Sequence, residues 1–135
     1  MAHRDAAVHH AARVDALTGA ANRGAFDEEL ARRCTLAASG GVGFALLLAD
    51  IDHFKSINDT YGHPIGDRVL HALVTFLRDR VRRDDMIARW GGEEFLVVLP
   101  EASLTLASDR AEEVRRAVES LRESEADPEF SQLTV

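Results

Sequence analysis

The sequence has few cysteine, proline and aromatic residues, and less positive than negative charge. Its 135 residues include one cysteine, three prolines and 6% aromatic residues. A lone cysteine excludes an internal disulfide and a zinc site made of several cysteines. Few prolines and 46% hydrophobic residues argue against a disordered chain. We therefore expect one packed domain, and the apolar residues 36–38 predict that Cys34 is a buried thiol on a helix.

Charge and hydropathy exclude two further classes of protein. The chain has 16 Lys and Arg against 23 Asp and Glu, a net charge of −7, which disfavours a nucleic-acid partner. The longest apolar stretch, residues 44–49, is too short to span a bilayer. The first fourteen residues contain no apolar run of the kind found in a signal peptide. We expect a cytoplasmic protein, with no membrane contact by this segment.

The pattern of apolar residues predicts alternating helices and strands. Helices are expected at residues 5–16, 22–38, 53–58, 65–82 and 103–122, and strands at 44–51, 86–90, 93–99 and 130–135. Asn22 suits an N-cap, and Ser39-Gly40-Gly41 ends the helix that follows it. From residue 44 onward the order is β-α-β-β-α-β. This order predicts an α+β fold with a ferredoxin-like antiparallel sheet and flanking helices.

Two strand features carry more specific predictions. The run from Phe44 to Ile51 is continuously apolar, which is typical of a central strand covered on both faces. Gly91-Gly92 separates two apolar runs and predicts a two-residue hairpin turn, because glycine tolerates a positive φ at both positions.

Three carboxylates lie at predicted strand ends. Asp50 ends the first strand, while Glu93 and Glu94 follow the glycine turn, so the three can converge if those strands are neighbours. Such a cluster suits Mg²⁺, which prefers oxygen ligands and is commonly shared with substrate phosphates. The alternative is that Asp50 and Asp52 cap the short helix that follows and the glutamates are solvated. Adjacent strand residues also point to opposite faces, so one glutamate would meet the metal while the other orients a neighbour.

Polar residues also gather beside two predicted helix ends. Asn58, His63 and Asp67 lie around a glycine turn, and an amide with a carboxylate can pair with a guanine edge. The alternative for Asp67 is an N-cap. Arg82 and Asp85 follow the long helix, where arginine can bind phosphate or guanine, although arginines are also common at helix C-termini.

Taken together, three segments resemble the GGDEF family of diguanylate cyclases. They are Asp15-Ala-Leu-Thr-Gly-Ala-Ala-Asn22-Arg23, the stretch from Asp50 through Lys55 to Asp67, and Ala88-Arg-Trp-Gly-Gly-Glu-Glu-Phe95. The resemblance runs from Asp15 to the end of the chain. It implies a fold similar to nucleotide cyclase and polymerase palm domains. It also implies a bacterial signalling enzyme that condenses two GTP molecules into cyclic di-GMP and two pyrophosphates at a homodimer interface.

The same resemblance implies a role for each site residue. Glu93, Glu94 and Lys55 would be catalytic, with a glutamate assisting deprotonation of the 3′-hydroxyl and the lysine neutralising phosphate charge. Asp50, the Ile51 carbonyl and Glu93 would hold Mg²⁺, with Mn²⁺ as an alternative cation. The substrate-binding set would be Phe54, Asn58, His63, Asp67, Gly91 and Gly92. Arg82 and Asp85 would form an inhibitory site for the product.

The chain departs from the family pattern in two places. Ala20 and Gly24 replace the family's Leu and second Arg. The family also continues beyond the strand at 130–135 with another helix and further phosphate contacts, so we expect the chain to lack the C-terminal part of the domain. Residues 1–14 would be a linker or helix from an upstream sensor, and 15–135 the catalytic domain. The alternative function is a non-catalytic module that binds GTP or cyclic di-GMP, or an inactive fragment.

Overall fold

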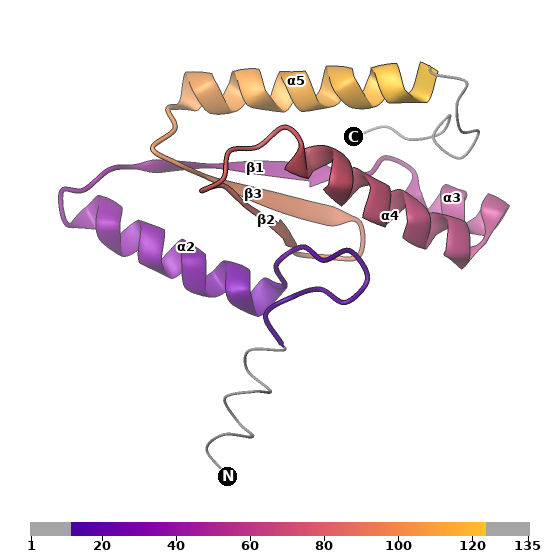
Figure 1. Ribbon diagram of the computed structural model, residues 1–135, viewed down its shortest axis with the longest axis horizontal. Helices are drawn as coiled ribbons and strands as arrows, with labels where there is room; N and C mark the ends of the chain where they lie inside the picture. The colour runs from indigo at the N-terminus through magenta and orange to yellow at the C-terminus, as the bar shows by residue number, and fades with distance from the viewer. Residues whose placement is uncertain (1–11, 124–135) are drawn as a thin grey trace, which may run out of the picture.

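The computed structural model describes the backbone of residues 12–123 and the side chains of residues 12–119 (Figure 1). Its elements in order are α2 (Arg23–Ala38), β1 (Phe44–Asp50), α3 (Phe54–Tyr61), α4 (His63–Arg78), β2 (Met86–Arg89), β3 (Glu94–Pro100) and α5 (Leu104–Glu123). This is the predicted α+β order through the last helix. The strand predicted at 130–135, and residues 5–11 of the first predicted helix, lie outside the described residues.

The segment before α2 is not helical where the structure describes it. Residues 12–16 were predicted to end a helix, but they form turns and a bridge in which Val14 pairs antiparallel with Ala21. The helix prediction is wrong here because Asp15 closes a turn instead: its amide donates to the Ala20 carbonyl at 2.7 Å, and its carbonyl accepts from Gly19 at 2.8 Å.

Helix α2 begins and ends as the sequence predicts. The Asn22 side chain accepts a hydrogen bond from the amide of Ala25, and the chain leaves the helix at Ser39. The buried or half-buried positions recur at three- and four-residue spacing, at residues 25, 26, 29, 30, 33 and 37. Cys34 is off this stripe and is exposed. The prediction of a buried thiol is therefore wrong, because helical periodicity and not the nearest neighbours decides which side faces the sheet.

The sheet is antiparallel with strand order β1-β3-β2. In the described part of the chain, β3 is central and β1 lies at the edge. The prediction that Phe44–Ile51 is a central strand covered on both faces is not met, since Leu46 and Leu48 are 42% and 66% exposed. A continuous apolar run identifies a strand, but it does not specify which neighbours cover it.

Helices cover the two faces of the sheet (Figure 1). On one face, α4 and α5 pack over Phe95, Val97 and Leu99 of β3 and form the larger core. On the other face, Phe26 of α2 packs against Ala88 and Val98 in a smaller core. Alternate residues of β3 therefore serve different cores, as the two-residue period of a strand requires.

The later helices differ slightly from their predicted bounds. Helix α4 was expected at 65–82 but spans His63–Arg78, because Pro64 fits the first turn of a helix. Ser103 caps α5 by accepting from the Leu106 amide at 3.1 Å. Ala107, Val114 and Val118 of α5 are buried, whereas Leu106 is 38% exposed. No helix in residues 12–123 is long and apolar enough to cross a membrane.

Candidate functional site

Strand pairing brings Asp50 to the β2–β3 hairpin. Asp50 is the last residue of β1 and pairs directly with Glu94, the first residue of β3. One step further, the Ile51 amide donates to the Glu93 carbonyl at 3.2 Å. Side chains of directly paired residues lie on the same face of a sheet. Asp50 and Glu94 therefore lie on one face of the sheet. Glu93 lies one residue earlier, level with the buried Ile51, on the opposite face.

The hairpin loop is longer than predicted. Strand β2 ends at Arg89 and β3 begins at Glu94, so residues 90–93 form a four-residue loop. The Glu94 carbonyl accepts from the amides of Trp90 at 2.9 Å and Gly91 at 3.3 Å, which closes the loop. Neither Gly91 nor Gly92 has a positive φ, so the predicted two-residue turn is wrong. A Cβ at Gly92 would meet no atom within 4 Å.

A second polar group lies where α3 joins α4. Gly62 links the helices with φ +89°, a conformation that favours glycine, and its amide donates to the Asn58 carbonyl at 2.8 Å. The side-chain oxygen of Asn58 is buried and has no hydrogen-bond partner within the described structure. A Cβ at Gly66 would lie 1.8 Å from that oxygen. The close approach of α4 therefore requires glycine at position 66.

The remaining predicted residues lie around this junction. Lys55 is exposed in the first turn of α3, and His63 is exposed at the start of α4. Asp67 is also exposed, and it is the fifth residue of α4, so the N-cap alternative for it is wrong. His53 occupies the N-cap position of α3 without a side-chain cap bond, so neither Asp50 nor Asp52 caps that helix. Phe54 is 8% exposed and packs in the larger core.

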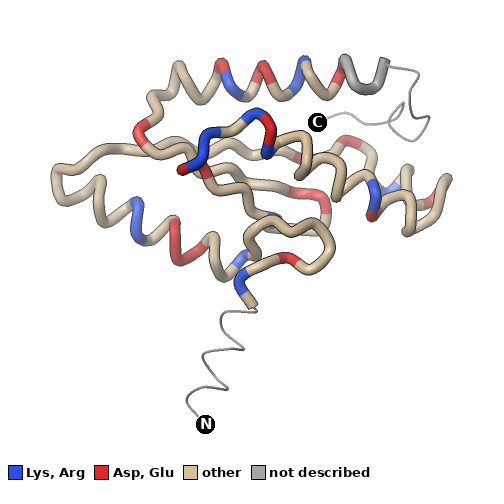
Figure 2. The backbone as a smooth tube through the Cα atoms, viewed as in Figure 1, with Lys and Arg blue, Asp and Glu red and all other residues tan. Residues whose placement is uncertain are grey.

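The β2–β3 hairpin and the α3–α4 junction, which carry most of the predicted site residues, lie at the same end of the sheet. Figure 1 shows α3 and the first turns of α4 extending past the end at which β2 turns into β3. Figure 2 shows the negative charge of the hairpin at that same end. Among the described residues, no group of three or more His, Cys, Asp or Glu side chains is gathered closely enough to hold a metal unaided.

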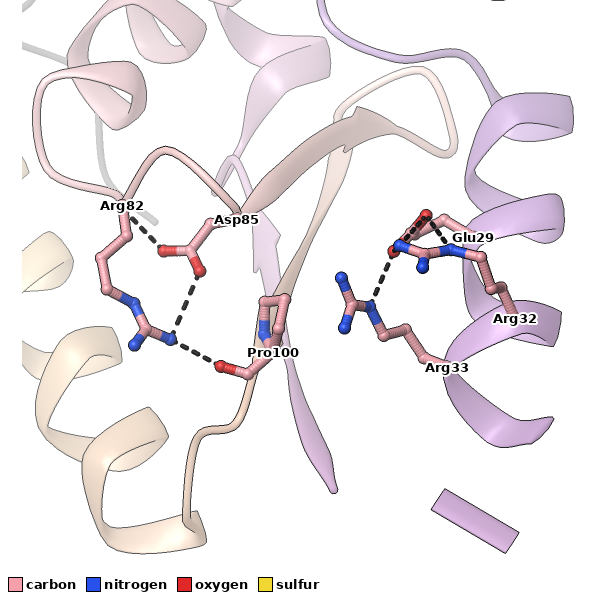
Figure 3. Close-up of polar contacts among 6 residues, drawn as sticks. All are labelled: Glu29, Arg32, Arg33, Arg82, Asp85 and Pro100. Atoms are coloured by element: carbon pink, nitrogen blue, oxygen red, sulfur yellow. Dashed lines mark hydrogen bonds and ion pairs between the residues drawn. The ribbon is translucent and has the colours of Figure 1, made fainter. Parts of the chain in front are cut away.

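The Arg82 and Asp85 pair lies elsewhere, between the end of α4 and the end of β3 (Figure 3). Asp85 has a side chain that is 0% exposed, and it accepts from the Arg82 amide at 2.7 Å. The Arg82 guanidinium donates to the Pro100 carbonyl at 2.7 Å and lies 3.5 Å from the second carboxylate oxygen of Asp85. That oxygen is buried and has no hydrogen-bond partner in the described structure.

Helix α2 carries a separate charged cluster, also drawn in Figure 3. Glu29 forms ion pairs with Arg32 at 2.9 Å and with Arg33 at 2.8 Å. Burial raises the pKa of Glu29, but the two guanidinium groups outweigh burial and lower it overall. These pairs stabilise consecutive turns of α2 and involve no predicted site residue.

Sequence reasoning missed one ion pair at the site. Arg89, the last residue of β2, lies 3.4 Å from Asp15, and its other terminal nitrogen donates to the Gly92 carbonyl at 2.9 Å. Burial raises the pKa of Asp15, but hydrogen bonds from Thr18 and the charge of Arg89 lower it overall. Asp15 and Arg89 both lie in segments that carried the family resemblance, but 74 residues separate them. No local pattern could pair them.

Comparison with known proteins extends these observations. Residues 12–135 match the family described as diguanylate cyclase, GGDEF domain. Over 104 residues, the chain is 45% identical to the diguanylate cyclase DgcP of Pseudomonas aeruginosa, which covers 77% of this chain and 16% of DgcP. It is 44% identical over 104 residues to the response regulator PleD of Caulobacter vibrioides, which covers 77% of this chain and 23% of PleD.

Solved structures agree with these relatives. The GGDEF domain of DgcB from Caulobacter crescentus, in complex with c-di-GMP, superposes with a TM-score of 0.81 at 38% identity, over 91% of this chain and 71% of that chain. The chain spans less than a third of the length of the curated relatives named above. Because the family match covers almost the entire sequence, the chain belongs to the GGDEF-domain family of diguanylate cyclases.

Proposed function

We propose that this chain is a diguanylate cyclase domain that uses GTP and a divalent cation. The observation that carries the proposal is the pairing of Asp50 with Glu94, which joins the end of β1 to the acidic hairpin. In the reaction, the 3′-oxygen of each GTP bonds to the α-phosphorus of the other while the bond to pyrophosphate breaks. Two pyrophosphates leave, the hydroxyl protons pass to a base, and the product is cyclic di-GMP.

Asp50, the Ile51 carbonyl and Glu93 would hold Mg²⁺, with Mn²⁺ as an alternative. The donors fit a hard cation because they are all oxygens, and the strand register places their backbones at one sheet end. Too few carboxylates gather there to complete the coordination, which suits a cation shared with triphosphate oxygens. The cation would neutralise charge on the phosphates. Glu93 or Glu94 would take the proton from the 3′-hydroxyl.

Guanine would bind at the junction of α3 and α4. The buried side-chain oxygen of Asn58 has no partner in the described chain, and a buried polar atom of this kind gains free energy from a donor. Guanine offers N–H donors to it and to the exposed carboxylate of Asp67. Phe54, which is buried in the larger core, and the Asn58 side chain both lie beside Gly66, and His63 is exposed at the start of α4.

The hairpin glycines and Lys55 would bind the phosphates. No atom of the described residues would contact a Cβ at position 92 within 4 Å, so packing in this part of the chain does not require glycine there. We attribute the glycine to close approach of a phosphate to the backbone at Gly91 and Gly92. Lys55 is exposed on α3 and would neutralise charge that develops during transfer.

Cyclic di-GMP would also inhibit the enzyme at Arg82 and Asp85. The Asp85 carboxylate oxygen that lies 3.5 Å from Arg82 and accepts no hydrogen bond in the described structure suits a guanine N–H donor, and the Arg82 guanidinium suits a phosphate or a guanine edge. Binding would require the guanidinium to shift from the Pro100 carbonyl or to share its donors with the ligand.

The assembly and context follow from the chemistry. Each domain would hold one GTP, so condensation requires a homodimer. GTP as substrate favours a cytoplasmic setting, and residues 1–14 would connect residues 15–135 to an upstream sensor.

Incubation with GTP and Mg²⁺, followed by chromatography, tests the proposal. We expect cyclic di-GMP and pyrophosphate in a 1:2 ratio. If a chain extended through the family's C-terminal elements yields no cyclic di-GMP, the enzyme proposal is wrong. GTP or cyclic di-GMP binding without turnover in that longer chain would instead support the alternative, a non-catalytic nucleotide-binding module.

A further inference from the structure

The hairpin loop is fastened to the N-terminal turn of the domain, which contains no predicted catalytic residue. The N-terminal turn, residues 13–22, is closed on itself by Asp15. One Asp15 carboxylate oxygen accepts from the Thr18 amide at 3.0 Å and from the Thr18 hydroxyl at 2.7 Å. Thr18 is 2% exposed. These hydrogen bonds and the burial of Thr18 give the turn a defined conformation before α2 begins.

The backbone of this turn also pairs with the outer edge of β2. Ala21 donates to the Ile87 carbonyl at 2.9 Å, and its own carbonyl accepts from the Arg89 amide at 2.9 Å. Ala21 and Ala88 thus form a parallel bridge. The turn holds the last residue of β2 in place immediately before the loop begins.

Arg89 extends this attachment into the loop. Its guanidinium lies 3.4 Å from Asp15 on one side and donates to the Gly92 carbonyl at 2.9 Å on the other. The Asp15 and Arg89 side chains are only 22% and 20% exposed, so solvent screens this pair less than a surface pair. Gly92 immediately precedes Glu93. Arg89 therefore holds the loop one residue before the glutamate that is proposed to bind the cation or act as the base.

A second contact lies beside the first. The Arg23 guanidinium stacks over the Trp90 ring at 4.2 Å from its centroid, which joins the start of α2 to the first residue of the loop. Trp90 is the only tryptophan of the chain and is 37% exposed. Its fluorescence therefore reports on the position of the loop, whether or not catalysis occurs.

We propose that Asp15 and Arg89 are positioning residues that set the location of the hairpin loop and hence of Glu93. This inference rests on the proposed cyclase function only for its effect on turnover. Asp15 fixes the guanidinium of Arg89, and Arg89 fixes the Gly92 carbonyl. Loss of the Asp15 charge, or of the planar fork with which Arg89 reaches both Asp15 and the Gly92 carbonyl, releases the loop while leaving the strands paired.

The test compares Asp15→Asn and Arg89→Lys with Glu28→Gln. An asparagine oxygen can still accept from Thr18, so Asp15→Asn removes mainly the charge. Lysine keeps the charge but cannot reach both partners as a planar fork. Glu28→Gln is the matched control. It breaks an exposed ion pair between α2 and Arg13 of the N-terminal turn, and Glu28 makes no contact with the hairpin in this ion pair.

We expect acrylamide quenching of Trp90 to increase about twofold in both test variants and to stay unchanged in the control. With GTP and Mg²⁺, kcat should fall by a factor on the order of ten to a hundred, because small displacements of reacting groups are costly. The KM for GTP should rise by a smaller factor than kcat falls, because the proposed guanine site at the α3–α4 junction is untouched, while the hairpin glycines proposed to bind phosphate move with the loop. Asp15→Glu should recover part of kcat.

Unchanged Trp90 quenching in both test variants would overturn the inference, whatever happens to activity. Increased quenching with normal kcat would overturn the role in catalysis. If the wild-type protein makes no cyclic di-GMP, the proposed function fails, but the quenching measurement still decides whether the pair positions the loop. If Asp15→Asn does not fold, as judged by circular dichroism, Arg89→Lys decides the matter because the Asp15–Thr18 turn is intact in it.

Discussion

At the scale of single residues, two glycines in the site have opposite surroundings. Gly66 lies against the Asn58 side chain, where a Cβ would come within 1.8 Å of a buried oxygen. Gly92 faces open space in the hairpin loop. Packing in the interior therefore requires glycine at position 66, whereas no contact among the described residues requires it at position 92.

Gly66→Ala should therefore lower both stability and nucleotide affinity. We expect a loss of about 1–3 kcal/mol in the free energy of unfolding, because the methyl group must displace Asn58 or α4. Urea denaturation measures the stability, and calorimetry with GTP measures the affinity. Gly92→Ala is the matched control and should change stability by less than about 0.5 kcal/mol. Equal stability losses in the two variants would contradict this interpretation of the α3–α4 junction.

The lowered pKa of Asp15 predicts that the stability of the fold depends on pH. The folded pKa of Asp15 is lowered, because Thr18 and Arg89 outweigh burial. The ionised carboxylate therefore stabilises the fold above the ordinary aspartate pKa of about 3.9, and this contribution is lost as the pH falls through the lower folded value. Asp15→Asn should be less stable by about 1 kcal/mol at pH 7. Its stability should also fall less steeply below pH 4 in denaturation curves. Parallel pH curves for the variant and the wild type would exclude the effect.

Cys34 shows how far a single-residue prediction can fail. Its neighbours in sequence are apolar, but α2 turns Phe26 and Leu30 toward the sheet and leaves position 34 outside. The Asn22 cap was predictable, because its hydrogen bond to Ala25 is three residues away. Local chemistry could be inferred from the sequence, whereas the orientation of a weakly amphipathic helix depended on its partner.

At the scale of elements, the pairing of β1 with β3 creates the candidate catalytic site. Asp50→Asn should abolish turnover that depends on Mg²⁺, because it removes a carboxylate from the proposed cation site. Activity across a Mg²⁺ titration is the measurement, and Asp52→Asn, an exposed aspartate two residues on, is the control. Normal turnover by Asp50→Asn would mean that the cation lies elsewhere.

The same titration distinguishes the two glutamates. Glu94 pairs with Asp50, whereas Glu93 lies one step into the loop. If Glu93 holds the cation, Glu93→Gln should raise the Mg²⁺ concentration needed for half-maximal rate by about tenfold or more, and Glu94→Gln should lower the rate at saturating Mg²⁺. The reverse pattern would exchange the two roles. Sequence alternation could predict that the glutamates diverge, but not which one meets Asp50, because strand register is a non-local property.

Arg82 follows α4 and bonds to the end of β3, so its structural role must be separated from its proposed role in binding cyclic di-GMP. Arg82→Ala should weaken cyclic di-GMP binding by roughly ten- to a hundredfold, the value of a charged hydrogen bond. It should also lower the melting temperature, because the bond to the Pro100 carbonyl is lost. Calorimetry with cyclic di-GMP measures the first effect, with exposed Arg83→Ala as the control. Unchanged affinity together with a lower melting temperature would leave Arg82 a purely structural residue.

At the scale of the whole molecule, one domain would bind only one of the two GTP molecules that the proposed reaction joins. The initial rate should therefore rise with the square of protein concentration until the dimer is saturated. Product formation across a dilution series, compared with sedimentation of the same samples, tests this. A rate that stays proportional to concentration in samples that sediment as monomers would contradict the homodimer proposal.

The exposed thiol of Cys34 gives the molecule a built-in means of measurement. The chain has one cysteine and one tryptophan, and Trp90 contacts the first residue of α2. Eleven residues separate Arg23 from Cys34, which places the thiol about 16 Å along the helix axis. An energy-transfer acceptor attached to Cys34 would be excited by Trp90 alone. Movement of the hairpin relative to α2 could then be followed in the unmutated protein as nucleotide, cation or product binds.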